Sequence, residues 1–156
     1  MFSQTSEYAL RVIVYLAGCN GDPATNRVIS SGTMVPQGYL AKVLQTLSRA
    51  GLVKSQRGLH GGTVLAKDPN LLTLFDVVQA VDPIRRIESC PLAVLAHGKQ
   101  LCPLHTRLDQ AIGGIETVLR TSTIADLMAS KSRHQPLPLC EPQPVHPKRK
   151  KVRAAR

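Results

Sequence analysis

The segment from Pro36 to Gly51 constrains the fold of this chain more than any other. Its apolar residues recur at the i, i+3, i+4, i+7 spacing of a buried helix face; they are Leu40, Val43, Leu44 and Leu47. A proline in the first helical turn and a glycine just beyond the last are the usual bounds of a helix. The opposite face carries small, amide and basic side chains, namely Gly38, Ala41, Lys42, Gln45 and Arg49. Such a face suits a helix that lies in a major groove, although a helical hairpin with a solvated face has the same pattern.

A shorter helix is expected immediately before this one. Thr25 can cap it, Val28 and Ile29 supply its apolar side, and Gly32 begins the turn GTMV that should follow it. Two short helices joined by a tight turn, the second with a polar and basic outer face, predict a helix-turn-helix.

Residues 52–66 are predicted to form a β-hairpin after that pair of helices. Two short apolar runs flank QRGLHGG, whose glycines at 58, 61 and 62 permit a tight turn. A hairpin in this place is a wing. Arg57, near its tip, is expected to reach the adjacent minor groove, as arginines do where that groove is narrow.

Four further helices follow from cap residues and periodicity. They begin near Ser3, Thr73, Pro103 and Thr123, and the first of them ends near Gly18. The helix from Pro103 has an apolar stripe at Leu104, Leu108, Ile112, Ile115 and Leu119. Because few other elements remain to cover this stripe, we expect a second copy of the chain to do so, in a two-fold dimer. The pair Gly113 and Gly114 in this helix implies close approach or local bending.

Charge is segregated along the chain, which carries a formal net charge of +10. Between Asp22 and Asp68 there is no acidic residue, whereas six basic residues occur there: Arg27, Lys42, Arg49, Lys54, Arg57 and Lys67. Solvated faces usually mix both signs, so this run indicates an anionic partner such as double-stranded DNA. Residues 131–156 hold eight basic residues, one acid and five prolines. They predict a disordered basic tail, which either binds polyanions without sequence choice or only aids solubility.

Composition excludes several classes of protein. The chain is 43% hydrophobic but only 3% aromatic, so its core must be built from Leu, Val, Ile and Ala, as in a small helical domain. Its 156 residues are too few for a barrel enzyme of roughly 250 residues. No apolar run approaches the ~18 residues that cross a bilayer and no leader is evident, so a cytoplasmic protein without a membrane partner is expected.

Cys90, His97, Cys102 and His105 form the chain's candidate ligand site. The C-x-x-H spacing at a helix start places Cys102 and His105 on one side, which suits a metal. Zinc, an iron–sulfur cluster of mixed ligation, or a metal-free pair of redox thiols are all compatible with these residues. Cys19 is expected in the core. An enzyme is not expected, because we find neither an activated nucleophile nor a glycine-rich phosphate loop.

Several segments together resemble the Rrf-type winged helix-turn-helix transcriptional regulators, the IscR- and NsrR-like proteins. They are SEYALR at 6–11, GYLAKVLQTLSRAGLV at 38–53, SQRGLHGG at 55–62, and the later cysteine loop with CPLH at 102–105 and TIADL at 123–127. The resemblance spans about residues 1–130 in order, and the R-G-x-x-G-G wing is its most specific part. It implies a dimeric DNA-binding repressor or activator whose long helix crosses between subunits.

The resemblance also implies a cofactor site. Many relatives carry three loop cysteines and a fourth ligand of another kind. Cys90 matches the first cysteine, Cys102 the third and His105 the histidine ligand, while Glu7 falls where relatives place an acidic ligand from the partner subunit. The middle cysteine is replaced by Ala96, beside His97. A site of Cys90, Cys102, His105 and either His97 or Glu7 fits a [2Fe-2S] cluster, or it is the remnant of a lost one.

The sequence therefore predicts a mainly α fold with a small β-hairpin: a winged helix-turn-helix domain over 1–82, a cysteine/histidine loop and dimerisation helix over 83–130, and a tail over 131–156. Gln37, Lys42 and Gln45 are expected to contact the edges of the bases. Phosphate or minor-groove contacts are assigned to Tyr39, Arg49, Lys54 and Arg57, with His60 in the same turn. The expected function is a sequence-specific DNA-binding regulator that senses redox state, nitric oxide or iron–sulfur status. A non-specific architectural protein and a cluster-free regulator are the alternatives.

Overall fold

The computed structural model describes residues 2–58, 61–90 and 101–129 and is mainly helical, as predicted. In chain order the elements are α1 (Gln4–Gly18), α2 (Asn26–Thr33), α3 (Gln37–Arg49), β1 (Val53–Gln56), β2 (Gly62–Leu65), α4 (Leu74–Val81), α5 (Pro103–Thr121) and α6 (Ile124–Ala129). The predicted tail, with Cys140, lies outside the described residues, as do His60, Ala96 and His97. Within the described ranges, no helix is both long and apolar enough to cross a membrane.

The helices begin where their cap residues predict. The Ser3 hydroxyl accepts a hydrogen bond from the backbone N–H of Ser6 at 3.2 Å, and Thr25 caps α2 in the same way. Thr73 and Asp76 form a reciprocal capping box at α4, each side chain accepting from the other's backbone N–H. Because each cap satisfies N–H groups that the first helical turn leaves unpaired, these boundaries follow from local chemistry.

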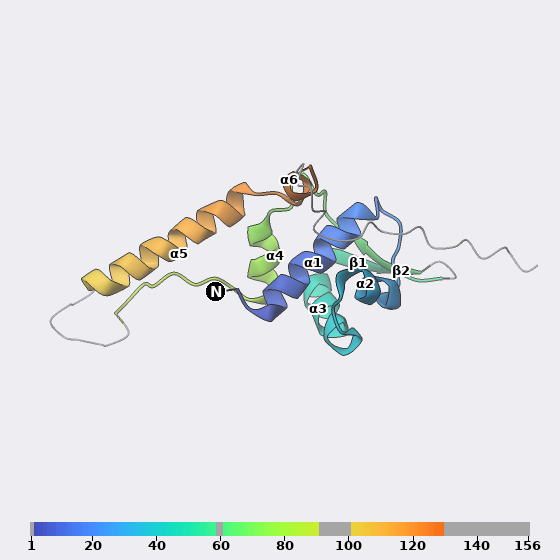
Figure 1. Ribbon diagram of the computed structural model, residues 1–156, viewed down its shortest axis with the longest axis horizontal. Coiled ribbons are helices and arrows are strands. Elements are labelled where there is room, and N and C mark those ends of the chain that lie inside the picture. Colours follow the sequence, from blue (N-terminus) through green and yellow to red (C-terminus); the bar gives the residue numbers. More distant parts are fainter. Residues whose placement is uncertain (1, 59–60, 91–100, 130–156) are drawn as a thin grey trace, which may run out of the picture.

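The core surrounds α1, which packs against α2, α3, α4 and α6 (Figure 1). Its largest fully buried side chains include Ile13, Leu16, Ile29, Leu40, Leu47, Leu72 and Ile124. The buried residues of α3 are the four predicted from helical spacing, and Cys19 is a core residue as expected. The inward stripe of α3 thereby fixes which of its faces is left for a partner.

Gly32 does not end α2, which corrects the sequence prediction. The helix continues to Thr33, and the turn is made by Met34 in the left-handed region, with φ 56°. The ring of Tyr15 lies so close to Gly32 that an added Cβ would sit 2.3 Å from Tyr15 Cε2. The glycine is therefore required by packing between α1 and α2, not by the turn.

The wing is a two-stranded antiparallel sheet in which Val53 pairs with Leu65. Ala24, in the segment between α1 and α2, forms an additional antiparallel bridge with Thr63. The Ala24 N–H donates to the Thr63 carbonyl at 3.0 Å, and the Thr63 N–H donates back at 2.8 Å. This bridge, which periodicity did not predict, attaches β2 to the helical body.

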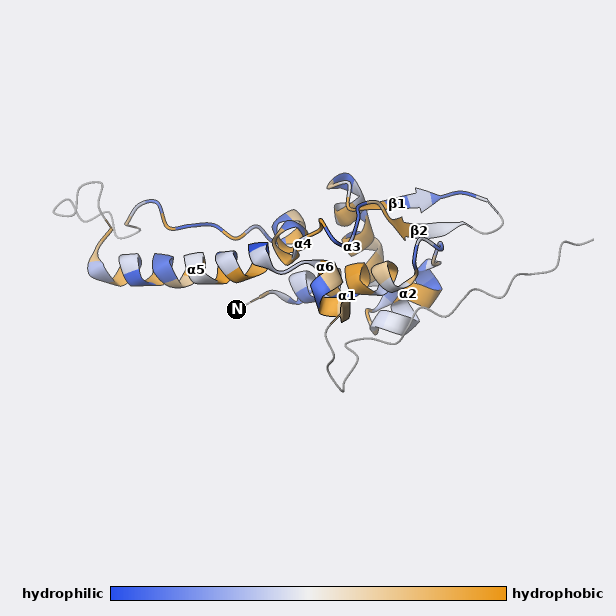
Figure 2. Ribbon diagram, turned by 90° about the horizontal axis from the view of Figure 1, so that it is seen from above, coloured by the Kyte–Doolittle hydropathy of each residue, from blue (hydrophilic) through white to orange (hydrophobic). Residues whose placement is uncertain are grey.

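The long helix α5 extends away from the helical body, and residues 82–90 run back along it without helix or strand (Figures 1 and 2). We call residues 82–90 the strap. The 19 residues of α5 span about 28 Å at 1.5 Å per residue. At its C-terminal end α5 is joined to the body, since Thr73 bridges Thr123 and the Leu74 N–H donates to the Ser122 carbonyl at 3.0 Å.

Much of the predicted apolar stripe of α5 is uncovered in a single chain. Of its five members, Leu104, Leu108 and Ile115 are exposed, and Val118, which the prediction did not include, is exposed as well. Leu119, near the body, is buried. Exposed apolar side chains in a row along one helix are typical of an interaction surface.

Candidate nucleic-acid interface and metal centre

The outward face of α3 carries the predicted base-reading side chains. Gln37, Lys42, Gln45 and Arg49 are all exposed, while the buried stripe holds the helix against the body. Amide and ammonium groups on a rigid, exposed helix face have the donors and acceptors that base edges require. α3 therefore has the orientation of a recognition helix.

The wing lies beside this helix, because α3 packs against β1. Lys54 and Arg57 are exposed on β1 and at its end, as predicted. Gly61 and Gly62 leave no room for side chains: an added Cβ at Gly61 would lie 2.5 Å from the Gln56 carbonyl oxygen. The hairpin thus brings two basic side chains next to α3 through tight backbone contacts.

The acid-free segment coincides with α2, α3 and the wing. Its six basic side chains are all exposed, at Arg27, Lys42, Arg49, Lys54, Arg57 and Lys67. The ion pairs found among the described residues involve Arg11, Arg86 and Arg120, and none of these six. Exposed cations without acidic neighbours generate a positive potential that attracts a polyanion.

Tyr39 has a structural partner that the sequence did not suggest. Its hydroxyl lies 3.0 Å from the Thr5 hydroxyl, and its ring meets that of Tyr8 edge-on at 5.5 Å. These contacts join the start of α3 to the start of α1. The phosphate contact assigned to Tyr39 remains a prediction.

Cys90, Cys102 and His105 come together at the far end of α5. Cys102 is the N-cap residue of α5, His105 lies in its first turn, and Cys90 is carried by the strap. The His105 Nδ1 atom is 3.1 Å from the Cys102 Sγ and 3.6 Å from the Cys90 Sγ. The three donor atoms lie within 4.8 Å of one another. Two thiols and an imidazole at this spacing can supply three ligands of a thiophilic metal centre.

The two candidates for the fourth ligand are not in this group. His97 lies outside the described residues. Glu7 is on α1, where its carboxylate is ion-paired with Arg11 and its side chain is 57% exposed. Within its own chain Glu7 is therefore not part of the cysteine–histidine group, and its role as a ligand from a partner subunit remains a prediction.

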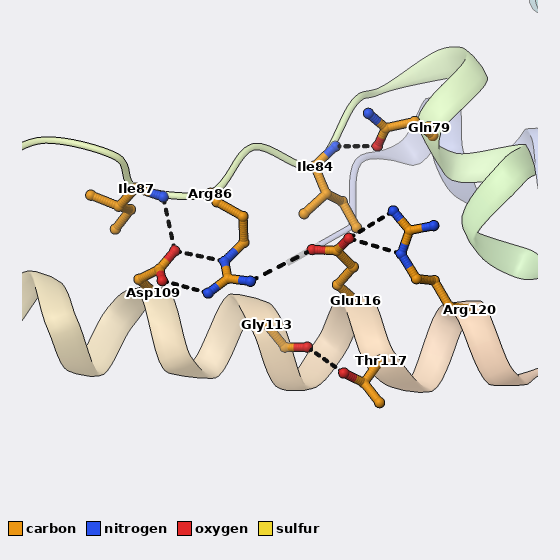
Figure 3. A network of polar contacts seen from close by, with 9 residues as sticks. All are labelled: Gln79, Ile84, Arg86, Ile87, Asp109, Gly113, Glu116, Thr117 and Arg120. Atoms are coloured by element: carbon orange, nitrogen blue, oxygen red, sulfur yellow. Dashed lines mark hydrogen bonds and ion pairs between the residues drawn. The ribbon is translucent and has the colours of Figure 1, made fainter.

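The strap is bound to α5 chiefly through the carboxylate of Asp109 (Figure 3). Arg86 donates to both oxygens of Asp109, from Nε at 2.7 Å and from Nη2 at 2.5 Å, and the Ile87 N–H donates at 2.9 Å. These hydrogen bonds lower the pKa of Asp109 to about 2. Neither the composition nor the helical spacing of the sequence predicts this clamp. Asp109 follows His105 by one turn, which is readable from spacing, but no periodicity connects it with Arg86, 23 residues earlier.

The contacts continue along α5 toward the helical body. Arg86 Nη1 is 3.9 Å from Glu116, whose carboxylate pairs with Arg120 at 2.8 Å. The Arg120 guanidinium stacks on the ring of Phe75 in α4, 3.5 Å from its centroid. Since α4 packs on α1 and α3, a row of polar contacts links the strap to the domain that carries α3.

The helix pair, the exposed face of α3 and the attached hairpin define a winged helix-turn-helix protein. A family model described as "Rrf2: Iron-dependent Transcriptional regulator" matches residues 2–130. The chain belongs to this Rrf2 family of transcriptional regulators, as the motifs predicted, and not to a family of enzymes.

Individual relatives agree with this assignment. The HTH-type transcriptional regulator NsrR of Geobacillus kaustophilus is 29% identical over 133 residues, which cover 81% of this chain and 88% of that protein. Protein aau3 of Rhizobium meliloti is 32% identical over 136 residues, covering 83% and 85%. The structure of CymR, the global cysteine regulator of B. subtilis, is similar with a TM-score of 0.68 and 26% identity, covering 81% and 95%. T. potens IscR shares the fold, with a TM-score of 0.68 and 24% identity over 82% and 85%.

Proposed function

We propose that this chain is a dimeric, sequence-specific DNA-binding regulator whose affinity for its operator depends on the state of Cys90, Cys102 and His105. The observation that carries the DNA-binding part is the exposed face of α3, with the wing beside it, on a segment whose six basic side chains are unpaired among the described residues.

Each side chain on this surface has a distinct role. Gln37 and Gln45 are suited to paired hydrogen bonds with adenine, and Lys42 to the acceptors of guanine. Arg49 and Lys54 would contact phosphates, which set the register of the protein on the duplex without reading sequence. Arg57, beyond the end of β1, would enter the minor groove.

The apolar stripe of α5 is proposed to be buried against a second copy of the chain. The exposed side chains Leu104 and Leu108 lie on a different side of α5 from Asp109, which binds Arg86 of the strap, whereas Ile112 and Ile115 line a pocket together with Pro83 and Ile84. Pairing two such helices buries apolar surface in both subunits and makes a two-fold assembly. Two recognition helices related by a two-fold axis match a palindromic operator.

Cys90, Cys102 and His105 would hold the sensing group. A [2Fe-2S] cluster is favoured for this site, and such a group supplies reversible one-electron redox chemistry and exchangeable ligands when bound. The chain itself brings the strap and the start of α5 together at these donors. A change in ligation would therefore alter how the strap lies on α5, and so the placement of α4 and the recognition helix.

The DNA-binding proposal is tested by selecting binding sites from random duplexes and measuring affinity by fluorescence anisotropy. We expect an enriched palindrome. Gln45→Ala should weaken binding to it by about 1–3 kcal/mol and relax preference at one position, whereas Lys54→Ala should reduce the salt slope by about one. Arg107→Ala, on the exposed surface of α5, is the control for loss of a positive charge. Equal affinity for every duplex would instead support a non-specific architectural protein.

The sensing proposal is tested by anaerobic purification followed by a visible spectrum and iron and zinc determinations. The double variant Cys90→Ser/Cys102→Ser should lose the bound metal and its absorption, while Ser89→Ala, beside Cys90 on the strap, should retain both. A colourless, metal-free wild-type protein would support a cluster-free regulator. Operator affinity that is the same with and without the bound group would remove the sensing role.

A further inference from the structure

The three donors of the candidate metal centre are held in very different ways. Cys102 and His105 are placed by the first turn of α5, whose backbone is fixed by helical hydrogen bonds. Cys90 belongs to the strap, which has no helix or strand. The position of the Cys90 thiol therefore depends on whatever binds the strap to α5.

Among the described residues, the polar contacts between the strap and α5 centre on Arg86. Its guanidinium forms two hydrogen bonds with Asp109 and approaches Glu116, and the adjacent Ile87 N–H binds the same Asp109 oxygen as Arg86 Nε (Figure 3). Asp109 is only 17% exposed. A bidentate arginine–carboxylate pair fixes orientation as well as distance, which a lysine cannot do.

We propose that Arg86 and Asp109 are a positioning pair that holds Cys90 within bonding reach of the metal bound by Cys102 and His105. This inference rests on the proposed function of that site. Asp109 follows His105 by one helical turn, so the residue that receives the strap and the residue that supplies the imidazole share one face of α5. The strap is thus fixed directly beside the ligands that Cys90 must meet.

The length of chain between Cys90 and the nearest anchor of the strap determines how strongly the positioning pair affects metal binding. With Ile87 bound to Asp109, Cys90 lies three positions beyond the anchor, a span of at most about 10 Å. Without the Asp109 carboxylate, which accepts from both Arg86 and Ile87, the nearest anchor among the described residues is Ile84, whose N–H donates to Gln79 Oε1 at 3.1 Å, six positions before Cys90. The effective concentration of a tethered group falls as about the −3/2 power of tether length, so the thiol becomes about threefold more dilute. The loss of the orientation that the guanidinium imposes adds to this dilution. We therefore expect the affinity for the metal to fall three- to tenfold.

Gly113 leaves room for the close approach of Arg86 to α5. The Arg86 guanidinium lies against the α5 backbone between Asp109 and Glu116, and a Cβ at Gly113 would be 3.1 Å from its Cζ and Nη1 atoms. Gly114, the next residue, has nothing within 4 Å of such a Cβ. The first glycine therefore serves the close approach of the strap.

The test is a titration of the reduced, full-length protein with Co²⁺, whose thiolate charge-transfer band reports each Co–S bond. Wild type should show the band of two thiolates. Asp109→Ala, which removes the acceptor of both Arg86 and Ile87, should bind Co²⁺ three- to tenfold more weakly and give a weaker band per bound Co²⁺ than wild type, because Cys90 is no longer held beside Cys102 and His105. Arg86→Lys keeps the positive charge but cannot form the bidentate pair. Its Co²⁺ affinity and band intensity should therefore lie between those of wild type and Asp109→Ala. Arg85→Ala, on the same strap and without an ion pair to any described residue, should match wild type.

A second measurement needs no metal. Hydrogen exchange of residues 84–90 should accelerate in Asp109→Ala, which removes the acceptor of the Ile87 N–H, and should be unchanged in Arg85→Ala. If Asp109→Ala fails to fold, Arg86→Ala is titrated in its place. Equal Co²⁺ affinity and band intensity in wild type and Asp109→Ala would overturn the positioning pair and leave the metal site standing. A wild-type protein with no thiolate band would overturn both.

Discussion

Replacing Gly62 with alanine should detach the wing from the helical body. An added Cβ at Gly62 would lie 2.6 Å from the carbonyl oxygen of Ala24 and 2.7 Å from its carbonyl carbon. Both neighbours are backbone atoms, so no side chain can rotate away. Ordinary contact begins at about 3.4 Å, so the two segments must separate by about 0.8 Å.

That separation is enough to break the bridge between Ala24 and Thr63. Its two hydrogen bonds, at 3.0 and 2.8 Å, would lengthen beyond hydrogen-bonding distance. Each contributes about 0.5–1.5 kcal/mol net, so the expected loss in unfolding free energy is about 1–3 kcal/mol. For a domain of this size the melting temperature should fall by roughly 3–10 °C.

Circular dichroism melting and anisotropy on the selected operator provide the two measurements. Gly62→Ala should lower both the melting temperature and the DNA affinity, since the displaced wing no longer holds Lys54 and Arg57 beside α3. Gly18→Ala is the matched control, because its Cβ would meet only Met128 Cε at 4.0 Å. If Gly62→Ala melts and binds DNA like Gly18→Ala, the bridge does not hold the wing.

Three further predictions concern α5 and the core. The Arg86 guanidinium and the Ile87 N–H hold the pKa of Asp109 at about 2, below its ordinary value of 3.8, so the clamp is complete above pH about 4 and is lost as the pH falls through 2. An NMR titration should find that midpoint, and in Arg86→Ala it should move up toward 3.8; a wild-type midpoint near 3.8 contradicts the clamp. Gly114→Ala should stabilise α5 by up to about 1 kcal/mol in thermal melts, whereas Gly113→Ala should lose that gain by displacing Arg86. Leu47→Ala, fully buried, should cost about 2–5 kcal/mol in urea unfolding, and a cost below 1 kcal/mol would mean that α3 is not packed as described.

Local patterns predicted most of the helices correctly because their causes are local. The caps at Ser3, Thr25, Thr73 and Thr123 act on N–H groups within three residues. The apolar spacing of residues 37–49 alone identifies which face of α3 is buried. Gly32 is an exception, because local patterns predict a turn at this glycine although it lies inside α2. Its actual role is to leave room for the ring of Tyr15, 17 positions earlier in the chain.

In the candidate site, too, contacts within one element could be predicted from the sequence, whereas contacts between distant segments could not. Helical periodicity predicted which side chains of α3 are exposed, whereas the DNA contacts assigned to α3 and the wing remain predictions. Cys102 and His105 lie together, as predicted, because they share a helical turn. The approach of Cys90 to that pair was a hypothesis that the fold confirmed geometrically, whereas the metal itself and the contribution of Glu7 remain predictions. The Arg86–Asp109 clamp was not anticipated, because nothing in spacing or composition selects that partner.

The amino-acid sequence by itself determined the helices, the hairpin, the faces that α3 buries and exposes, and the family, since each of these depends on neighbours a few positions apart or on a contiguous motif. Only the tertiary structure decided that Ala24 holds the wing, that Tyr15 requires Gly32 and that Arg86 fastens the strap to α5. Such contacts join residues some 17 to 40 positions apart, and their choice of partner is settled by the packing of the whole domain.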